Sequence, residues 1–508
     1  MTKENTSGKF ELLLTQQVGK IQKYERYSKM NGKAKREKKQ VVPNNSVLNV
    51  LSQEELGRRM AEVGSSLKAS TWHDLETHGK FGKNEKLSFI SEDMLIVGCD
   101  IGSEEHFSRA IDTRGRELSC KILSFSNDAE GFQKAYDWML ELAARHGKKQ
   151  IVLGIEPTGH YWFCLTAWMV ANGISVVQVN PYAVKQTKEL EDNSQEKNDR
   201  KDPKLIANLV KDGNYGMPYL PEGIYADIRR LNRFREQLTE DRIRTINRLH
   251  REMKIYFPEY MDAFGKVEGS FTLEVLKRAP FPEDILALGA EGLRSIWHEA
   301  KLRGRGYSRA DAIVRLAAQS VGLRNGTEAS REAVKWFASQ IELLEHKIQE
   351  TDEKLRQKCN EIPYAENLLD IQGIGGTVLA GILAEMGDIR RFDNVKEIQK
   401  LSGLGLAACS SGKHKGQTRI SYRGRKRLRY WLFQAARSAV AHAKEFKSLH
   451  VYYTTRLQNP LKKMQSLIVI ACKILRIVFT ILQTGRPYSP TKMLQDIKRT
   501  ADTAAQAA

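Results

Sequence analysis

From Met94 onward the chain alternates short apolar runs with turn residues, a pattern typical of strands joined by tight turns. After the third run the period lengthens, and apolar positions recur at helical spacing as far as Gly147. Two more strand-like runs follow, with a helical stretch between them. The pattern predicts the order β-β-β-α-β-α-β over these residues: 94–102, 106–113, 117–125, 128–147, 150–156, 161–171 and 174–180.

This order predicts a mixed sheet covered by helices, because antiparallel strands lead into alternating strand and helix units. It resembles the RNase H fold of RuvC-like nucleases and many transposases. The remainder of the chain is helical in pattern, so the expected fold class is α/β plus all-α. The α/β part is an RNase H-like mixed sheet, followed by a coiled-coil middle and a helical C-terminal domain.

Two acids occupy the ends of predicted strands, Asp100 in "GCDIG" and Glu156 in "LGIE". If the first and fourth strands are neighbours, as in that fold, both carboxylates enter one crevice at the strands' carboxyl ends. Paired acids repel unless a divalent cation lies between them, and Mg²⁺ takes oxygen ligands while keeping waters for a phosphate substrate. The alternative is that each acid only accepts hydrogen bonds from turn amides.

A third acidic motif, "EKNDRKDPKLIANLV", covers residues 196–210. Asp199 and Asp202 are three residues apart, so one helical turn places them on the same side. Asp202 before Pro203 also fits the start of a helix, with the aspartate as N-cap. Three basic residues near these acids suit a phosphate backbone: Arg200, Lys201 and Lys204.

The middle of the chain has two long helical patterns. Residues 224–257 combine apolar positions near heptad spacing with arginines on the other faces. Steps of three and four residues, typical of a coiled coil, separate the apolar positions of the second pattern: Val334, Phe337, Ile341, Leu344, Ile348, Thr351 and Leu355. Heptads do not fix the partner, so an intrachain hairpin and a dimer seam are equally good interpretations.

Residues 368–387 contain "GIGG" before an apolar helix. This resembles a helix-hairpin-helix motif, in which backbone amides beside Gly373 and Gly375 receive a DNA phosphate. Close packing of helices is the alternative use of these glycines. An acid-free basic run follows and predicts a phosphate-binding surface: Lys413, Lys415, Arg419, Arg423, Arg425, Lys426, Arg427 and Arg429.

The charge of the 508-residue chain supports a polyanionic partner. Its net charge is +20 and its pI is about 9.5. Excess Lys and Arg gain free energy by displacing counterions from nucleic acid, and a membrane surface is the weaker alternative. Nine Lys or Arg and two Glu lie between residues 20 and 39, in a polar N-terminal extension. We expect this run to be solvated, with a nucleic-acid arm as the second interpretation.

The six cysteines are scattered without a CxxC pair, and the N-terminus has no secretory leader pattern. These features favour the reducing cytoplasm and no structural zinc. The most apolar late run, 466–482, contains Lys473 and Arg476. Because each charge is costly at a bilayer centre, the run predicts a buried helix and no membrane span.

Together these motifs resemble the DEDD transposases of the IS110 family of bacterial insertion sequences, relatives of the Piv DNA invertase. The resemblance lies in "GCDIG", "GIEPTG" and "KNDRKDPKLIA", which carry Asp100, Glu156, Asp199 and Asp202 in the family's order. It covers residues 94–210 and 365–440. The long basic N-terminal extension departs from the family.

The segment "CSSGKHKG" matches the family's segment in which a serine before glycine is the nucleophile. The resemblance implies that role for Ser411, although Ser410 is adjacent. It also implies a DNA transposase or recombinase that uses Mg²⁺ or Mn²⁺, acts as a dimer or tetramer and is guided by a bridge RNA pairing with donor and target DNA. A RuvC-like junction nuclease and a non-enzymatic nucleic-acid-binding regulator are the alternatives.

We expect five regions along the chain. A basic, partly disordered extension (1–92) precedes the RuvC-like DEDD domain (93–215). A helical linker and oligomerisation region (216–362) leads to the transposase domain with the serine (363–490), and a tail ends the chain (491–508).

Overall fold

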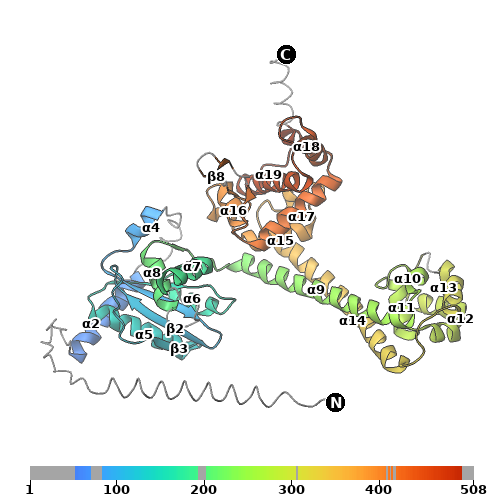
Figure 1. Cartoon of the computed structure of the whole chain (residues 1–508), viewed down its shortest axis with the longest axis horizontal. Coiled ribbons are helices and arrows are strands. Elements are labelled where there is room, and N and C mark those ends of the chain that lie inside the picture. Colours follow the sequence, from blue (N-terminus) through green and yellow to red (C-terminus); the bar gives the residue numbers. More distant parts are fainter. Residues whose placement is uncertain are drawn as a thin grey trace, which may run out of the picture. The chain divides into compact units, whose positions relative to one another are not determined.

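The computed structural model describes these residues: 52–69, 83–192, 202–304, 307–407, 410–411, 414–415 and 419–494. The chain forms two compact units, Met1–Pro218 and Tyr219–Ala508 (Figure 1). Several predicted features lie outside the described residues: the basic run 20–39, Asp199, Arg200, Lys201 and Lys413.

The N-terminal unit contains a six-stranded mixed sheet in the order β3-β2-β1-β4-β5-β6. Its strands are β1 (Met94–Ile101), β2 (Glu105–Ile111), β3 (Leu123–Ser126), β4 (Gln150–Ile155), β5 (Ser175–Val179) and β6 (Tyr215–Gly216). β1 is antiparallel to β2 and parallel to β4, and β4 is parallel to β5. The predicted order of strands and helices along the chain and the pairing of the first and fourth strands are confirmed, and the short β6 was not predicted.

The third strand is shorter than predicted. Glu117 makes only an isolated bridge to Ile111, and regular pairing with β2 begins at Leu123. Polar Ser119 is buried here because its hydroxyl accepts from the Ala110 amide at 3.1 Å. A side-chain contact therefore replaces part of the expected ladder.

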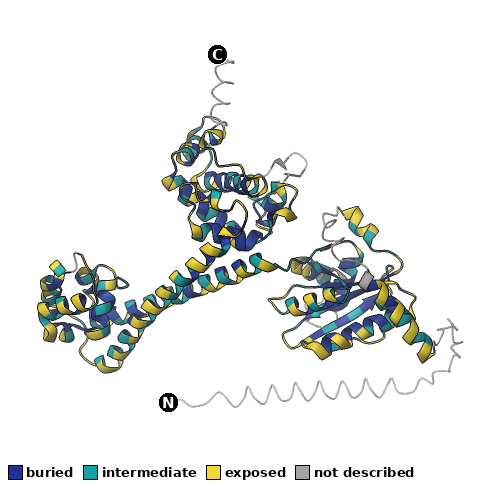
Figure 2. Ribbon diagram, turned by 180° about the vertical axis from the view of Figure 1, so that it is seen from behind, coloured by how far each residue is buried: buried dark blue, intermediate teal, exposed yellow. Residues whose placement is uncertain are grey.

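Among its described residues, this unit has six helices: α2 (Gln53–Ala69), α4 (Lys83–Phe89), α5 (Ala129–Arg145), α6 (Trp162–Ala171), α7 (Pro181–Asp192) and α8 (Asp202–Lys211). α5 begins where the Asp128 carboxylate accepts from the Gly131 amide at 2.7 Å, an N-cap contact. α2 packs against α5, so part of the N-terminal extension is folded onto the sheet domain. The strands between these helices are buried (Figure 2).

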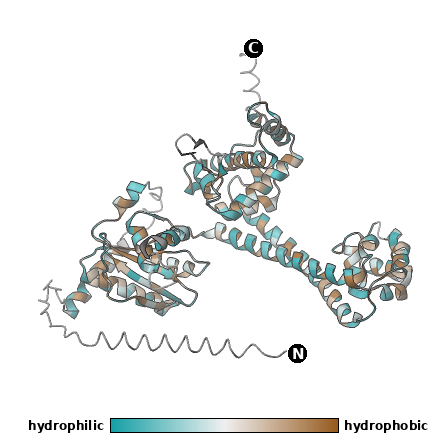
Figure 3. Ribbon diagram, viewed as in Figure 1, coloured by the Kyte–Doolittle hydropathy of each residue, from teal (hydrophilic) through white to brown (hydrophobic). Residues whose placement is uncertain are grey.

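The C-terminal unit is built around two long helices, α9 (Gly223–Tyr256) and α14 (Thr327–Asn360). Arg235 pairs with Asp352 at 2.5 Å and Arg242 with Glu345 at 3.4 Å, so the helices run antiparallel. Of the heptad residues of α14, Val334, Ile341, Thr351 and Leu355 are buried within the chain, whereas Leu344 and Ile348 are half-buried. The packing of α14 on α9 is the intrachain hairpin of the first interpretation. Both helices mix polar and apolar turns (Figure 3).

One hydrophobic core lies toward each end of this helix pair. The first joins α9 and α14 to α10 (Tyr260–Phe264), α11 (Ser270–Arg278), α12 (Pro282–Glu299) and α13 (Ala310–Ala318). The second contains α15 (Gly376–Met386), α16 (Val395–Leu401), α17 (Lys426–His442), α18 (Lys444–Thr455), α19 (Lys463–Thr484) and α20 (Pro490–Met493).

α19 is the apolar helix that the sequence predicts to be buried. Within the described part of the chain, it alone is long and apolar enough to cross a membrane. The core helix of a globular domain meets the same criterion, and Ile470, Ile474 and Val478 are buried in the second core. The packing of α19 therefore follows the prediction.

Candidate active site

Asp100 and Glu156 lie at the same edge of the sheet. β1 and β4 are parallel, with Gly98 opposite Gly154 and Cys99 opposite Ile155. Asp100 and Glu156 are the next residues along the two strands. The register therefore brings both acids to the carboxyl end of the central strand pair, as predicted.

Two glycines allow α8 to lie directly on these strands. A Cβ at Gly98 would lie 1.9 Å from the carbonyl oxygen of Pro203 and 2.6 Å from the amide nitrogen of Ala207. A Cβ at Gly154 would lie 2.4 Å from a methyl of Val210. Residues two apart on a strand share a face, so α8 covers the face that also carries Asp100 and Glu156.

Asp202 is the first residue of α8, as the sequence predicts. The Lys188 ammonium of α7 donates to its Oδ1 at 2.7 Å, and these side chains are only 21% and 16% exposed. The close packing of α8 on Gly98 thus positions a third carboxylate near the first two. Lys188 supplies a positive charge that the motif analysis missed.

The carboxylates interact electrostatically. The pKa of Glu156 is raised to about 7, first because the side chain is partly buried and then because the charges of Asp100 and Asp202 oppose its ionisation. Lys188 acts in the opposite direction. One ammonium therefore does not compensate the three carboxylates.

The residues are suited to a divalent cation. All three acids offer the hard oxygen ligands that Mg²⁺ and Mn²⁺ take, and their uncompensated charge favours a cation. Among the residues that the structure describes, no group of three or more His, Cys, Asp or Glu is already arranged to hold a metal ion. Asp199 of the predicted set lies outside those residues.

The predicted serine segment forms short paired strands in the C-terminal unit. β8 (Ser410–Ser411) is antiparallel to β9 (His414–Lys415), with Ser411 opposite His414. A second pair joins β7 (Leu406–Ala407) to β10 (Arg419–Ile420). Ser411 thus lies in one arm of a hairpin, and the three described acids belong to the other unit.

The glycines before α15 differ from each other. Gly373 has φ of +92°, and a Cβ there would lie 2.7 Å from the Ser438 backbone of α17. Close packing, the alternative interpretation, therefore accounts for Gly373. Gly375 is the N-cap of α15 and has no atom within 4 Å of a Cβ position. Its surroundings leave space for a ligand at the helix N-terminus.

The predicted basic residues of the described part differ in their surroundings. Arg419, Arg423 and Lys426 are exposed, as a phosphate-binding surface requires. Contacts with protein groups include the following: Lys204 pairs with Glu117 at 3.1 Å, Arg425 donates to the Glu385 carbonyl at 2.5 Å, Arg427 pairs with Glu236, and Arg429 donates to the Ser402 carbonyl at 2.9 Å. Charge alone did not predict these contacts.

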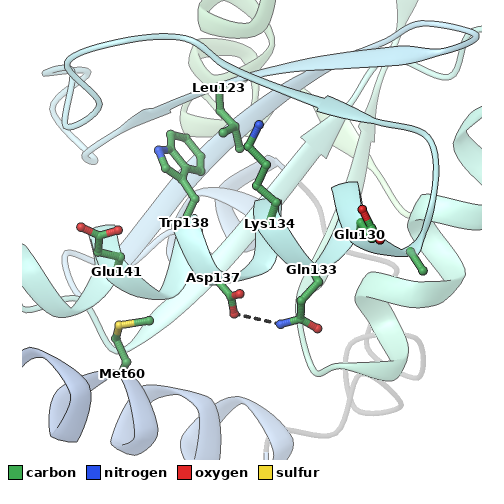
Figure 4. Close-up of a pocket in the computed structure, with 9 residues that line it drawn as sticks. Met60, Leu123, Glu130, Gln133, Lys134, Asp137, Trp138 and Glu141 are labelled. Carbon is green, nitrogen blue, oxygen red and sulfur yellow. Dashed lines mark hydrogen bonds between the residues drawn. The ribbon is translucent and has the colours of Figure 1, made fainter.

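A separate pocket of about 770 Å³ lies between α2, β3 and α5 (Figure 4). Met60, Leu123 and Trp138 give it an apolar lining. Its charged lining residues are one lysine, Lys134, and three acids, Glu130, Asp137 and Glu141. The acidic lining disfavours phosphate, so this pocket differs in chemistry from the basic surfaces of the chain.

Comparison with known proteins identifies the family. A transposase family model of the IS110 DEDD type matches residues 97–258, and a model described as "Transposase IS116/IS110/IS902 family" matches residues 365–451. The chain belongs to the IS110 family of transposases. The two matches include the three described acids of the transposase and Ser411, so the predicted family is confirmed.

Curated relatives agree with this membership. The transposase is 24% identical to the "Insertion element IS116 uncharacterized 44.8 kDa protein" of Streptomyces clavuligerus over 78% of this chain and 97% of the relative. It is 26% identical to the "Mini-circle putative transposase for IS117" of Streptomyces coelicolor over 63% and 79% of the two chains. It is 24% identical to the "Pilin gene-inverting protein" of Moraxella lacunata over 47% and 75%.

Proposed function

We propose that this transposase cuts and rejoins DNA by using Ser411 as nucleophile and an acidic site of Asp100, Glu156, Asp199 and Asp202. The observation that carries the acidic half is the register of β1 and β4, which brings Asp100 and Glu156 to one edge of the sheet, with Asp202 at the start of the helix that packs on the same face. The match of the serine-containing region to the family model supports the other half.

The acids would hold Mg²⁺ or Mn²⁺, which when bound supplies positive charge to a phosphodiester under attack. Ser411 loses its proton as Oγ forms a bond to phosphorus, and the bond from phosphorus to the 3′-oxygen breaks. The leaving 3′-oxygen takes up a proton. A 3′-hydroxyl of another strand then attacks the phosphoserine, which restores the serine hydroxyl and rejoins DNA.

The exposed basic residues Arg419, Arg423 and Lys426 lie in β10, in the loop after it and at the start of α17. They suit contacts to the DNA backbone around the cut phosphate. On the basis of the sequence alone, we also assign contacts with the DNA backbone to Lys413, Lys415, Arg200 and Lys201. Gly375 offers a further phosphate contact at the N-terminus of α15.

The proposal also includes a bridge RNA that guides the transposase, and the cytoplasm as the place where the transposase acts. The net charge of +20 supports a large polyanion, and the family resemblance supports a structured guide. We assign residues 93–215 to the acidic domain, 216–362 to the helical linker and oligomerisation region, and 363–490 to the serine domain. We place no part of the chain in a membrane.

Capture of a covalent protein–DNA species tests the serine mechanism. We expect the wild-type chain, incubated with its DNA and Mg²⁺, to give an adduct that survives denaturing electrophoresis. Ser411→Ala should abolish the adduct, whereas Ser410→Ala should only weaken it. An adduct that persists in Ser411→Ala would refute the nucleophile assignment.

A RuvC-like nuclease is the second candidate, because the acidic site by itself can activate water. It predicts cleavage without any adduct and normal activity of Ser411→Ala. Asp100→Asn distinguishes both enzymes from a non-enzymatic regulator, since it should abolish cleavage and leave nucleic-acid binding near normal.

A further inference from the structure

A second charged cluster lies in the C-terminal unit. Four arginines and one glutamate interact electrostatically there, and we refer to these five residues as the arginine cluster. Arg229 and Arg233 come from α9, Arg391 from the turn η3 (Ile389–Arg391), Arg425 from the N-cap of α17, and Glu385 from the last turn of α15. Four elements thus contribute to one site.

One partly buried arginine of the cluster, Arg229, is incompletely satisfied by the protein. Nη1 of Arg229 is buried and has no hydrogen-bond partner. Burial and the charge of nearby Arg425 lower the pKa of Arg229 to about 10. Arg425 donates one hydrogen bond to the Glu385 carbonyl at 2.5 Å, and burial lowers the pKa of Arg425 as well. A buried guanidinium with an unmade hydrogen bond is costly unless a ligand completes it.

Glu385 does not neutralise the cluster. Its side chain is 3% exposed, and its Oε1 accepts no hydrogen bond. The Nη2 of Arg233 is 3.9 Å from that oxygen, which is an ion-pair distance without a hydrogen bond. The next acid, Asp388, pairs with Arg390 at 2.6 Å. The cluster therefore keeps a surplus of positive charge.

The outer arginines make the cluster accessible. The Arg233 side chain is 44% exposed, and Arg391 is also exposed. The Arg391 guanidinium lies 3.2 Å from the centre of the Tyr219 ring. Tyr219 is itself held closely, since a Cβ at Gly387 would lie 2.1 Å from its hydroxyl oxygen. Stacking on this ring orients the planar guanidinium in advance of binding.

We propose that the arginine cluster is a binding site for one backbone phosphate of a nucleic acid. Phosphate oxygens match the paired donors of a guanidinium, and an anion would offset the surplus charge and complete the donors of Arg229. Arg233 and Arg391 meet the phosphate from solvent, with Arg229 and Arg425 beneath. The inference rests on the proposed function only in attributing the phosphate to DNA or RNA.

Thermal unfolding of the full chain with inorganic phosphate, compared with chloride at equal ionic strength, tests the site. A ligand that binds the folded state raises Tm. We expect a phosphate-dependent rise that is reduced by Arg229→Gln and by Arg233→Gln. Arg233→Gln alters an exposed side chain, so it remains informative if Arg229→Gln does not fold. Arg437→Gln, an equal charge change on an exposed face of α17, should keep the rise.

Glu385→Gln should change the phosphate-dependent rise in Tm in the opposite direction from the arginine substitutions. Removal of this negative charge should increase the phosphate-dependent rise in Tm, because the arginines then face the anion without a competing carboxylate. A purely structural cluster predicts no such gain. A full phosphate effect in Arg233→Gln, or its loss in Glu385→Gln, would overturn the proposal.

Salt titrations with oligonucleotides identify the source of the phosphate. Arg233→Gln should lower the slope of log K against log salt by about one for the nucleic acid that uses the site. Duplex DNA and single-stranded RNA are the two probes, and Arg437→Gln is the control. If neither slope changes although the phosphate effect is lost, the assignment to a nucleic acid is wrong. Asp100→Asn should keep both readouts, which separates this outcome from failure of the proposed cleavage.

Discussion

Glu156 combines partial burial with two like-charged neighbours, and both raise its pKa to about 7. Its pKa in the unfolded chain is near 4.5, so the folded state binds the extra proton between these values. This contribution to stability is complete below about pH 4.5 and is lost as pH rises through about 7. Without a divalent cation, ionised Glu156 therefore destabilises the fold.

A divalent cation should reverse this effect, because it competes with the proton for Glu156. We expect Mg²⁺ to raise Tm more above pH 7 than below it. Glu156→Gln should remove most of the Mg²⁺ effect and raise the Tm of the metal-free protein above pH 7. Thermal scans at several pH values measure both changes.

Glu141→Gln on α5 is the control for this experiment, since Glu141 pairs with Arg145 and is not among the charges that shift the pKa of Glu156. It should leave the pH dependence of the Mg²⁺ effect unchanged. A Mg²⁺ effect that is equal on both sides of pH 7 would contradict the assignment of Glu156 as a ligand.

At the scale of single elements, the site depends on how closely α8 approaches the sheet. Gly98 meets the α8 backbone, whereas Gly154 meets a side-chain methyl of Val210. A backbone clash can be relieved only by moving the helix, whereas a clash with one methyl needs a smaller local shift. Asp202 begins α8, so movement of the helix also moves a carboxylate of the site.

We therefore expect Gly98→Ala to destabilise the protein by about 1–3 kcal/mol, as overpacking does in other cores, and Gly154→Ala to cost less. Gly98→Ala should also weaken amide-exchange protection in α8 and the Mg²⁺ effect on Tm. Chemical denaturation and hydrogen exchange measure these changes. Gly216→Ala is the matched control because a Cβ there has no atom within 4 Å. Equal stability of Gly98→Ala and Gly216→Ala would show that the close approach is unimportant.

The sequence predicts much of this arrangement. Alternation of short apolar runs predicted the order of elements along the chain. The resemblance of that order to the RNase H fold implied that the first and fourth strands are neighbours, with Asp100 and Glu156 at one edge. A glycine stands two residues before each acid, a signal for the approach of α8 that the motif analysis did not use. Lys188 was not predictable, because its role depends on the distance of α7 from α8.

Arg425 shows a second limit of sequence reasoning. It lies in a run of exposed basic residues, yet its guanidinium points to the Glu385 carbonyl. Residue type and spacing do not reveal which members of a basic run turn inward, because long side chains choose partners in the folded state. The arginine cluster could be found only from the structure, since its members come from four separate elements.

At the scale of the whole molecule, the acids and Ser411 belong to different compact units. The heptad positions of α14 are used largely within the chain, where α14 pairs with α9. The proposed mechanism uses groups from both units, so it predicts that they meet, either within one chain or between chains. We propose that they meet between chains, so that cleavage depends on assembly with nucleic acid.

Mixing two inactive chains tests this arrangement. Asp100→Asn and Ser411→Ala should each be inactive alone, and we expect part of the cleavage activity to return when they are combined. A wild-type acidic site from one chain then meets a wild-type serine from the other. Activity is measured as cut DNA after the mixture has been allowed to exchange subunits. A mixture as inactive as either chain would indicate that the site closes within one chain.

The antiparallel pair of α9 and α14 also makes the C-terminal unit adjustable in length. Each helix has 34 residues, or about 50 Å at 1.5 Å per residue. Removing one heptad from both helices at the same level would shorten the pair by about 10 Å and rotate its ends by only about 20°. The spacing between the two cores is thus a modular property, one that engineers can alter in discrete steps without redesigning either core.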